Sequence, residues 1–579
     1  MISSLVSALA GLALFAPAAS SAGSAADTVY LHGVVITVDD ARPKAQAVAV
    51  KDGKIVAVGS DAQVAALQGP GTRVVDLAGK TMVPGFVDGH SHIGDMVLGW
   101  NLVDLSSPPV GAVRDIAGLQ AAMRAAMDRA GPVESLLLGS GYDDSLLTER
   151  RHPTGAELDA VSATRPVCIF HISGHLAVCN SVAMKRLGFV KGAPNPPGGV
   201  IARDATGAPT GLLEEQAVFA MFGLMTPMTP AVAARSFDEI QTYYASLGYT
   251  TAQDGQTASP ATIDLLLKFQ ADKRLKIDIA AYPKWTIAEK MVASRGLKIG
   301  GPYQNRLKFA GVKITEDGSP QGKTAYLEQP YFHAPHGASA DYRGYPIMPQ
   351  AELDAWYDKF AALGWQVQTH CNGDACIDML IKAVEKTEAA HPGFAATRPV
   401  VIHSQVTRPD QLSAYKRLQI FPSFFAEHAF YWGDWHRDET LGPARAAFIS
   451  PTAAALKEGL QFSLHTDAPV VPPSPMHAMW SAVNRTTRSG QVLGADQKIS
   501  PMDALRALTI WPAWQHFDEA SRGSITVGKI ADLVVLDADP LKVDPAKIKD
   551  IAVITTIKDG QPIYEAGKTA VARKAFAQP

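Results

Sequence analysis

The stretch Pro84–His92, with the sequence Pro-Gly-Phe-Val-Asp-Gly-His-Ser-His, decides how the rest of this 579-residue chain is interpreted. It ends an apolar run that starts at Met82, so we predict a buried strand with two histidines at its carboxyl end. Because side chains alternate along a strand, His90 and His92 are expected on the same side. Two neutral imidazoles supply half of a zinc site. Alone, a His-x-His pair is a weak signal, since packed histidine pairs are common.

Seven further apolar runs follow this one, and stretches with helical periodicity alternate with them. Such alternation is typical of a parallel sheet, and eight strands are the number that closes a barrel. We therefore predict an α/β fold with a (β/α)8 TIM barrel over 82–514. The strands are expected at TMVPGFVDGHSHI (81–93), GYTTAQDG (248–255), LKIDIAAY (275–282), LKFAGVKIT (307–315), GWQVQTHC (364–371), RPVVIHSQ (398–405), QIFPSFF (419–425) and LQFSLHTDAPV (460–470).

Both ends of the chain carry hairpin signals. Asp52-Gly53 lies between two alternating apolar runs, and Asp559-Gly560 lies in a similar setting near the other end. An Asp-Gly pair in that position favours a tight two-residue turn. We predict one small β-domain built from 27–81 and 515–579. The segment at about 136–215 fits the barrel rhythm poorly, and it is expected either to form a wall over the barrel mouth or to extend the scaffold.

Four later predicted strands end in residues that suit a metal site. They are Lys313, His370, His403 and Asp467, and each follows an apolar run and precedes a polar or Gly/Pro-containing turn. In a barrel of this kind the carboxyl ends of the strands form the catalytic rim. Each residue has an ordinary structural explanation taken singly, but all of them at strand ends in one chain favour a shared site.

A lysine at an apolar strand end is unusual among these ligands. Burial disfavours its charged form and leaves a nucleophilic amine. Such an amine can take up carbon dioxide, and the resulting carbamate is an anionic oxygen ligand able to bridge two cations. We therefore predict that Lys313 is carboxylated. A bare lysine with a single metal is the alternative.

Bulk properties limit the partners. The formal net charge is −3, with 53 basic and 56 acidic residues, so neither nucleic acid nor an anionic membrane surface is an expected partner. A small-molecule substrate is expected, and a homodimer is possible for a large barrel protein. Residues 1–26 contain an apolar run followed by small residues, and this pattern predicts a signal peptide. We therefore expect a periplasmic or secreted protein. An uncleaved membrane anchor is the alternative. The four cysteines allow one bridge, although we expect buried thiols, Cys371 among them.

Several segments resemble the signature segments of the amidohydrolase superfamily, in particular the branch of N-substituted formamide deformylase and its relatives. They are PGFVDGHSH, VKITEDGS, THCNGDACID, VIHSQ, HTDAPV, ALTIWPA and GSITVGKIADLVVLD. The resemblance implies a distorted TIM barrel, a small composite β-sandwich and a centre that usually holds two Zn²⁺ ions. It also implies that His90, His92, His370, His403 and Asp467 are ligands and that Lys313 is the bridging carboxylated lysine. Two positions depart from that branch, His465 before Asp467 and Cys371 after His370, and neither removes a ligand.

The predicted reaction is hydrolysis of an amide-like C–N bond in a small, hydrophobic or aromatic substrate by a metal-bound hydroxide. Asp467 is expected to accept the proton of the attacking water and to return it to the leaving amine. His175 is a second catalytic candidate, for the carbonyl or the leaving group, although a structural role is equally expected. Substrate contacts are predicted for Tyr142, Glu316, Asp317, Phe430, Trp432 and His465.

Three other functions compete with this one. Hydrolysis of a cyclic amide or of an ester such as a lactone would use the same centre. A non-catalytic exported binding protein would be expected to lack a ligand, and none is missing. Phosphotriester hydrolysis shares the metal centre but not the branch-specific segments.

Overall fold

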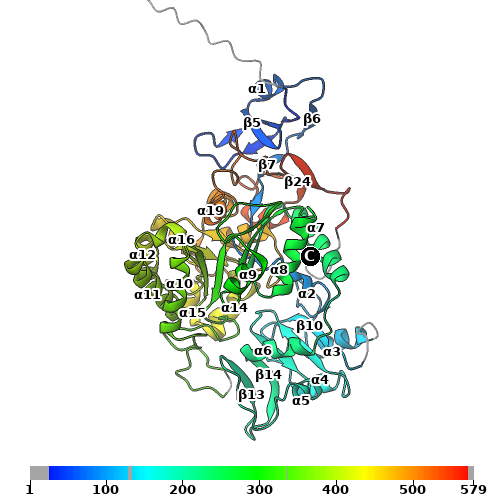
Figure 1. The fold of residues 1–579 in the computed structure, drawn as a ribbon, viewed down its shortest axis with the longest axis vertical. Coiled ribbons are helices and arrows are strands. Elements are labelled where there is room, and N and C mark those ends of the chain that lie inside the picture. The colour runs from blue at the N-terminus through cyan, green and yellow to red at the C-terminus, as the bar shows by residue number, and fades with distance from the viewer. Residues whose placement is uncertain (1–24, 128–132, 336, 572–579) are drawn as a thin grey trace, which may run out of the picture.

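The computed structural model describes residues 25–127, 133–335 and 337–571, so the predicted signal peptide lies almost wholly outside the described residues. Strands from both termini lie at one end of the long axis, helices and parallel strands occupy the middle, and an inserted sheet lies at the other end (Figure 1). Among the described helices, none has the length and apolar character needed to cross a membrane.

The middle region contains two sheets whose strands all pair in parallel, so the predicted α/β fold is confirmed. Each of the eight predicted segments contributes to them. The first sheet has the order β17 (Leu307–Phe309), β16 (Asp278–Pro283), β15 (Tyr249–Thr257) and β8 (Phe86–Val87). The second has the order β18 (Gly311–Thr315), β19 (Gln366–Cys371), β20 (Val400–His403), β21 (Phe421–Phe424) and β22 (Ser463–Leu464).

Backbone contacts join these two sheets at both edges. On one side Lys284, just after β16, forms a parallel bridge with Lys313 of β18. On the other side the His92 amide donates to the Ala468 carbonyl at 2.8 Å, and the Asp467 amide donates to the His90 carbonyl at 3.2 Å. These contacts bring the carboxyl ends of the first and last strands together.

Helices separate the parallel strands along the chain and pack a shared apolar core against them. Ser/Thr-Pro pairs begin several of these helices: the hydroxyl accepts from a backbone amide three residues on, and proline has the helical φ already set. The helices are α7 (Pro230–Ser246), α8 (Pro260–Ala271), α9 (Ala288–Arg295), α10 (Gln350–Ala362), α11 (Asp374–Ala390), α12 (Pro409–Leu418), α16 (Thr452–Lys457) and α17 (Pro475–Asn484).

The first predicted strand is divided in two. β7 (Thr81–Pro84) pairs with strands of the terminal region, and only β8 joins the parallel sheet. A Cβ atom at Gly85, between them, would lie 2.3 Å from the Thr250 hydroxyl, so the chain crosses a crowded point there. The prediction of one continuous strand from Met82 was therefore wrong, and both histidines lie in the turn after β8.

Strands from the two ends of the chain share one sheet. Its order is β25 (Gln561–Glu565), β24 (Val553–Lys558), β23 (Leu533–Leu536), β7, β2 (Val34–Ile36) and β3 (Lys44–Ala45). A second sheet has the order β5 (Lys54–Gly59), β4 (Ala47–Lys51), β1 (Thr28–Leu31) and β6 (Arg73–Asp76). Both Asp-Gly turns have positive φ at each residue, which a type I′ hairpin requires. A shared apolar cluster includes side chains of both sheets.

The inserted segment forms its own sheet and helices beside the parallel strands. The sheet has the order β13 (Gly199–Arg203), β14 (Pro209–Glu215), β12 (Leu176–Cys179), β11 (Val167–His171), β10 (Leu137–Tyr142) and β9 (Val103–Asp104). Its helices include α3 (Ile116–Ala125), α4 (Gly155–Asp159), α5 (Ser181–Arg186) and α6 (Gln216–Phe219). We call this region, residues 103–219, the lid sheet.

All four cysteines are paired in disulfides, so the prediction of buried free thiols was wrong. Cys168 and Cys179 join neighbouring strands of the lid sheet, and Cys371 bonds Cys376 in the first turn of α11. Strand alternation turns Cys371 away from the side that His370 occupies, as expected, but it turns the sulfur toward the helix that follows.

Candidate metal centre

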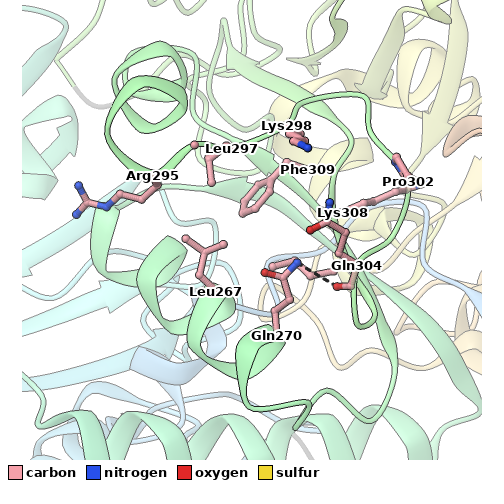
Figure 2. Close-up of a pocket in the computed structure, with 11 residues that line it drawn as sticks. Leu267, Gln270, Arg295, Leu297, Lys298, Pro302, Gln304, Lys308 and Phe309 are labelled. Carbon is pink, nitrogen blue, oxygen red and sulfur yellow. Dashed lines mark hydrogen bonds between the residues drawn. The ribbon is translucent and has the colours of Figure 1, made fainter.

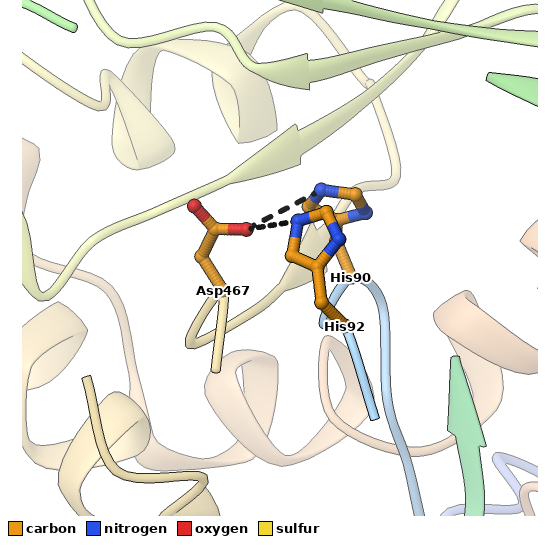
Figure 3. Close-up of side chains that lie close together, drawn as sticks. All are labelled: His90, His92 and Asp467. Atoms are coloured by element: carbon orange, nitrogen blue, oxygen red, sulfur yellow. Dashed lines mark ion pairs between the residues drawn. The ribbon is translucent and has the colours of Figure 1, made fainter. Parts of the chain in front are cut away.

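Three side chains from the first and last parallel strands meet at the carboxyl end of the sheets. One carboxylate oxygen of Asp467, Oδ1, lies 3.4 Å from His90 Nε2 and 3.2 Å from His92 Nε2 (Figure 3). These three ligand atoms lie within 4.8 Å of one another. Asp467 and His90 are buried, and His92 is partly exposed.

Two further imidazoles form a second group on the other side of Asp467. His403 Nε2 lies 3.1 Å from His370 Nδ1 and 4.0 Å from Asp467 Oδ2. His403 has a left-handed backbone with φ of 71°, and so does Asp467 with φ of 55°. Such strained conformations in non-glycine residues cluster at functional sites, because the surrounding structure must hold them.

Lys313 points into the same space from β18. Its Nζ lies 3.1 Å from His90 Nε2, and the side chain is almost fully buried. Burial lowers the pKa of Lys313 to about 7, since few charges offset the loss of water; Asp467 opposes the shift. A large share of the Lys313 side chains therefore carries a neutral amine at physiological pH.

Burial also lowers the pKa values of His90, His370 and His403 well below the ordinary histidine value, and the proximity of Lys313 and of other histidines adds to the effect. These imidazoles are therefore neutral, which is the form that binds metals. For His92, burial alone would lower the pKa, but the Asp467 carboxylate outweighs it and raises the value.

The donor set fits a divalent metal. Within the described part of the chain, Asp467 Oδ1 is buried and has no hydrogen-bond partner, although imidazole nitrogens surround it. Donors of a tetrahedral zinc site stand roughly 3.3 Å apart, given Zn–N distances of about 2.0 Å. The spacings of 3.1 to 3.4 Å agree with that value. The six predicted ligands thus lie together, although their role as ligands stays a prediction.

Residues beneath the ligands hold the imidazole rings in place. Gln253 of β15 accepts at Oε1 from His90 Nδ1 at 2.6 Å and donates to the Gly89 carbonyl at 2.8 Å. His465 Nε2 lies 3.1 Å from His403 Nδ1, and its other nitrogen lies 2.8 Å from the Ser423 hydroxyl. His465 is almost fully buried, and both of its ring nitrogens contact protein groups, the predicted ligand His403 and Ser423; its contact with substrate stays a prediction.

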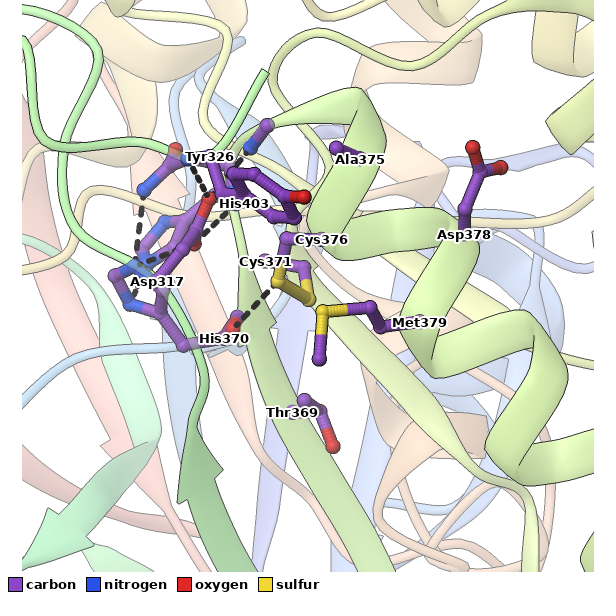
Figure 4. Close-up of a disulfide and its surroundings, with 12 residues drawn as sticks. Asp317, Tyr326, Thr369, His370, Cys371, Ala375, Cys376, Asp378, Met379 and His403 are labelled. Atoms are coloured by element: carbon purple, nitrogen blue, oxygen red, sulfur yellow. Dashed lines mark hydrogen bonds and ion pairs between the residues drawn. A yellow bond between two sulfur atoms is a disulfide. The ribbon is translucent and has the colours of Figure 1, made fainter. Parts of the chain in front are cut away.

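Asp317 shapes the loop after His370 (Figure 4). Its carboxylate accepts from the amides of Asn372 at 2.9 Å, Gly373 at 2.8 Å and Tyr326 at 3.0 Å. Burial raises the pKa of Asp317 to about 7, and these hydrogen bonds oppose the rise. Burial likewise raises the pKa of Glu316 to about 9. Both are fully buried, and their predicted contacts with substrate remain untested.

The lid sheet brings His175 to the metal centre. Its ring centroid lies 5.4 Å from that of His370, and its Nδ1 lies 2.8 Å from Glu215 Oε2. Glu215 ends β14 with φ of 50° and ψ of −121°, an unusual conformation for a residue with a side chain. The sequence analysis missed Glu215 and Gln253. Glu215 ends β14 after the apolar pair Leu212-Leu213, whereas Gln253 lies in the middle of β15 and carries no comparable signal in the sequence.

The other predicted substrate residues lie where the lid sheet meets the segment after β21. Trp432 donates from Nε1 to Asp143 Oδ2 at 2.7 Å, which ties the two regions together. Phe430 is partly buried and packs against Trp480. Tyr142 is fully buried in the lid sheet, and its hydroxyl lies 3.1 Å from His152 Nδ1.

A separate cavity of about 230 Å³ lies away from this centre (Figure 2). The carboxyl ends of α8 and α9 and the strand β17 line it, with Leu267, Gln270, Leu297 and Phe309 among the lining residues. None of the predicted site residues lines it, so we assign it no part in the chemistry.

The amidohydrolase family matches residues 73–564 of this chain. The protein belongs to that family. N-substituted formamide deformylase of Arthrobacter pascens is 28% identical over 562 residues, covering 93% of this chain and 98% of that protein. Protein LONG AFTER FAR-RED 3 of Arabidopsis thaliana is also 28% identical, over 94% of this chain and 92% of its own. Two proteins with quite different names are therefore equally similar to this chain in sequence.

Among solved structures, an uncharacterized metal-dependent hydrolase from Pyrococcus horikoshii OT3 superposes with a TM-score of 0.70 at 26% identity. The match covers 90% of this chain and 99% of that structure. The amidohydrolase described here thus belongs to a family with metal-dependent hydrolases among its solved structures. The resemblance to the superfamily and to its deformylase branch is confirmed.

Proposed function

We propose that this amidohydrolase cleaves an amide-like C–N bond in a small molecule with a hydrophobic or aromatic substituent. The single observation that carries the proposal is the position of Asp467 between two imidazole groups, with a buried carboxylate oxygen that lacks a hydrogen-bond partner within the described residues. A carboxylate in that position can bind a cation and also exchange a proton with water. The deformylase relative, whose name states a reaction on a formamide, supports the choice of bond.

We propose two Zn²⁺ ions as the resident metals. His90 and His92 would hold one, His370 and His403 the other, and a carboxylated Lys313 would bridge them. The neutral amine of Lys313 and its place beside His90 support this modification. When bound, such cations acidify a water molecule and polarise the substrate carbonyl.

The chain's own residues would then move the protons. Asp467 would accept the proton of the attacking water and pass it to the nitrogen of the leaving amine. His175 would donate a hydrogen bond to the carbonyl oxygen, with Glu215 orienting its ring. The lid sheet would also limit the access of bulk water, because it places the His175 ring 5.4 Å from the His370 ring, centroid to centroid.

The aromatic wall after β21 supports the choice of substituent. Phe425, Tyr431, Trp432 and Trp435 form one apolar cluster there with Val471. The rings of Phe425 and His403 are tilted relative to each other, with centroids 6.2 Å apart. One end of the apolar cluster therefore borders the metal centre. An apolar group attached to the scissile bond would gain roughly 25 cal/mol for each Å² buried against such a wall.

Several features of architecture and location belong to the same proposal. We propose that the two parallel sheets close into one distorted (β/α)8 barrel over 82–514 and that the terminal sheets form a β-sandwich from 27–81 and 515–579. The edge contacts and the shared apolar cluster support this.

We also propose an exported protein, periplasmic or secreted, that acts on small molecules as a monomer or homodimer. Two disulfides support an oxidising compartment.

A substrate screen of zinc-loaded enzyme tests the proposed function. It should include N-formyl amines, N-acyl amino acids, aryl amides, cyclic imides and lactones, with Asp467→Asn as the matched control. We expect turnover of a linear amide and a loss of about 10²–10⁴-fold in the variant, the range of a removed general base. Turnover of lactones alone would contradict the choice of bond, and turnover of cyclic imides alone would contradict the choice of a linear substrate. Near-normal turnover by the variant would contradict the role of Asp467.

A further inference from the structure

A guanidinium group borders the aromatic wall of the proposed substrate site. Arg488 occupies a turn after α17, and its Cζ lies 5.2 Å from the centroid of the Tyr431 ring and 5.8 Å from that of Phe430. Its Nη1 donates to the Pro108 carbonyl at 2.7 Å. Because Pro108 belongs to the lid sheet, the guanidinium lies where the lid sheet meets the aromatic wall.

Among the described residues, no carboxylate lies within ion-pair distance of Arg488. Two carboxylates act on it from farther away, and both already have partners. Asp143 accepts from Trp432 Nε1 at 2.7 Å, and Asp434 lies 3.1 Å from Arg437 Nη1. Burial lowers the pKa of Arg488, and the charges of Asp143 and Asp434 oppose this only in part. The positive charge of Arg488 therefore lacks a counter-ion in this part of the chain.

The hydrogen bonds of Arg488 are also incomplete. Arg485, in the same segment, donates from all three of its nitrogens to backbone carbonyls at 2.7 to 3.2 Å, which is typical of a structural arginine. In Arg488 only Nη1 has an acceptor among the described residues, and Nε is buried without one. Because unpaired buried charge costs free energy, an added anion would stabilise this group. Arg488 is partly exposed, so a ligand can reach it.

The turn that carries Arg488 is fixed on both sides of it. Ser489 donates from its amide and its hydroxyl to the Asp434 carboxylate, at 3.0 and 2.6 Å. The Thr487 hydroxyl donates to the same carboxylate at 3.0 Å. The position of the guanidinium is therefore set before a ligand arrives. Such preorganisation lowers the entropy that is lost on binding.

Three aromatic rings connect the metal centre with Arg488. The ring centroids of Phe425 and His403 lie 6.2 Å apart, and those of Phe425 and Trp432 also lie 6.2 Å apart. Trp432 and Tyr431 follow with centroids 5.6 Å apart, and Arg488 lies over Tyr431. A substituent that follows this wall from the scissile bond would reach the guanidinium with its far end.

We propose that the substrate carries a carboxylate at the far end of its apolar substituent and that Arg488 binds this carboxylate. The inference rests on the proposed function, because it narrows the substrate class of the same site. A planar guanidinium fits a carboxylate through two parallel hydrogen bonds. The aromatic rings beside it keep water away, which strengthens the attraction between the charges. Arg488 would thus select acidic amides over neutral ones.

Binding of two matched amines to the full-length, zinc-loaded protein tests this proposal. The probes are phenylethylamine and its para-carboxylated derivative, the amines that hydrolysis of the corresponding amides would release. Isothermal titration calorimetry measures the affinity for each. We expect the carboxylated amine to bind about 10–100-fold more tightly to wild type, the range of hydrogen bonds to a charged group. Arg488→Gln should lose this difference, and thermal melting checks its fold.

Arg150→Gln is the matched control. Arg150 also lies over a ring of the aromatic wall, 5.3 Å from the centroid of Trp435, but it is exposed. This variant should keep the wild-type preference. An equal loss of preference in both variants would indicate a general effect of net charge and would overturn the proposal.

Two other results would also overturn it. The first is equal affinity of wild-type protein for the two amines, which needs no variant. The second is a preference that persists in Arg488→Gln, because the carboxylate would then bind elsewhere, for instance at the metals. Since the readout is binding, a failure to hydrolyse amides would contradict the proposed function and leave the result for Arg488 intact.

Discussion

Replacing Glu215 by Gln tests whether the lid sheet takes part in the reaction. Glu215 lies at the end of β14, is 3% exposed, and accepts at Oε2 from His175 Nδ1 at 2.8 Å. Glutamine has the same shape and can still accept that hydrogen bond, but it carries no charge. The change therefore removes the electrostatic support of His175 while leaving its ring close to the present position.

The expected loss follows from how such support acts. A residue that orients a functional group typically contributes about 10–100-fold, or roughly 1.4–2.7 kcal/mol of transition-state stabilisation. Removing His175 itself, as the donor to the carbonyl oxygen, should cost about 10²–10³-fold in kcat. We expect Glu215→Gln to lower kcat by the smaller amount with little change in KM.

The pH profile has a definite direction. Burial alone would lower the pKa of His175, but the Glu215 carboxylate outweighs it and raises the value above the ordinary one. If the protonated ring is the active form, activity is present below that pKa and is lost as the pH rises through it. Without the carboxylate the pKa of His175 falls, so the alkaline limb of kcat should move to lower pH.

Steady-state kinetics of the two single variants and the double variant measure this coupling. If Glu215 acts through His175, the double variant is no slower than His175→Gln alone. Losses that multiply across the two sites would refute the reasoning, and so would an alkaline limb that stays in place in Glu215→Gln. Circular dichroism and thermal melting of each variant separate these outcomes from a damaged fold.

Three further predictions concern other parts of the molecule. Lys313→Met should abolish the bridge and lower the bound metal from two ions to one, measured by elemental analysis, whereas retention of both ions would contradict the bridging role. Trp432→Phe removes the donor to Asp143 at 2.7 Å and should raise KM for aromatic substrates several-fold with a small effect on kcat. An unchanged KM would remove this contact from substrate binding. Replacing Cys168 and Cys179 by Ser should lower stability by about 3 kcal/mol, as expected for the loop closed by residues 11 apart, and a denaturation midpoint equal to wild type would contradict this.

The parallel strands were predictable because their apolar runs are long and regular. Five of the eight runs carry the predicted ligands at or near their carboxyl ends, so strand ends and candidate ligands were found together. The division of the first run at Gly85 was not predictable, because apolar residues continue on both sides of it. What separates β7 from β8 is the approach of Thr250 from a strand more than a hundred residues away.

The disulfides show a different limit of the sequence. Cys371 and Cys376 lie on a strand and on the helix after it, and only the tight turn at Gly373 brings them together. A Cβ atom at Gly373 would lie 1.9 Å from the Tyr326 carbonyl, so a neighbouring loop presses the turn into this shape. Spacing alone did not reveal that contact, and strand alternation pointed to a free thiol.

The sequence separates the residues of the metal centre from those of the lid, but the fold joins them through His175. The predicted metal ligands come from strand ends, which the regular scaffold places close to one another. His175 and Glu215 come from the lid sheet, where two strands must meet at the correct register to align them. Changes in the lid can therefore alter the substrate without disturbing the metals. This explains in physical terms why the grouping of these side chains could be predicted from the sequence, while the scissile bond requires the proposed screen.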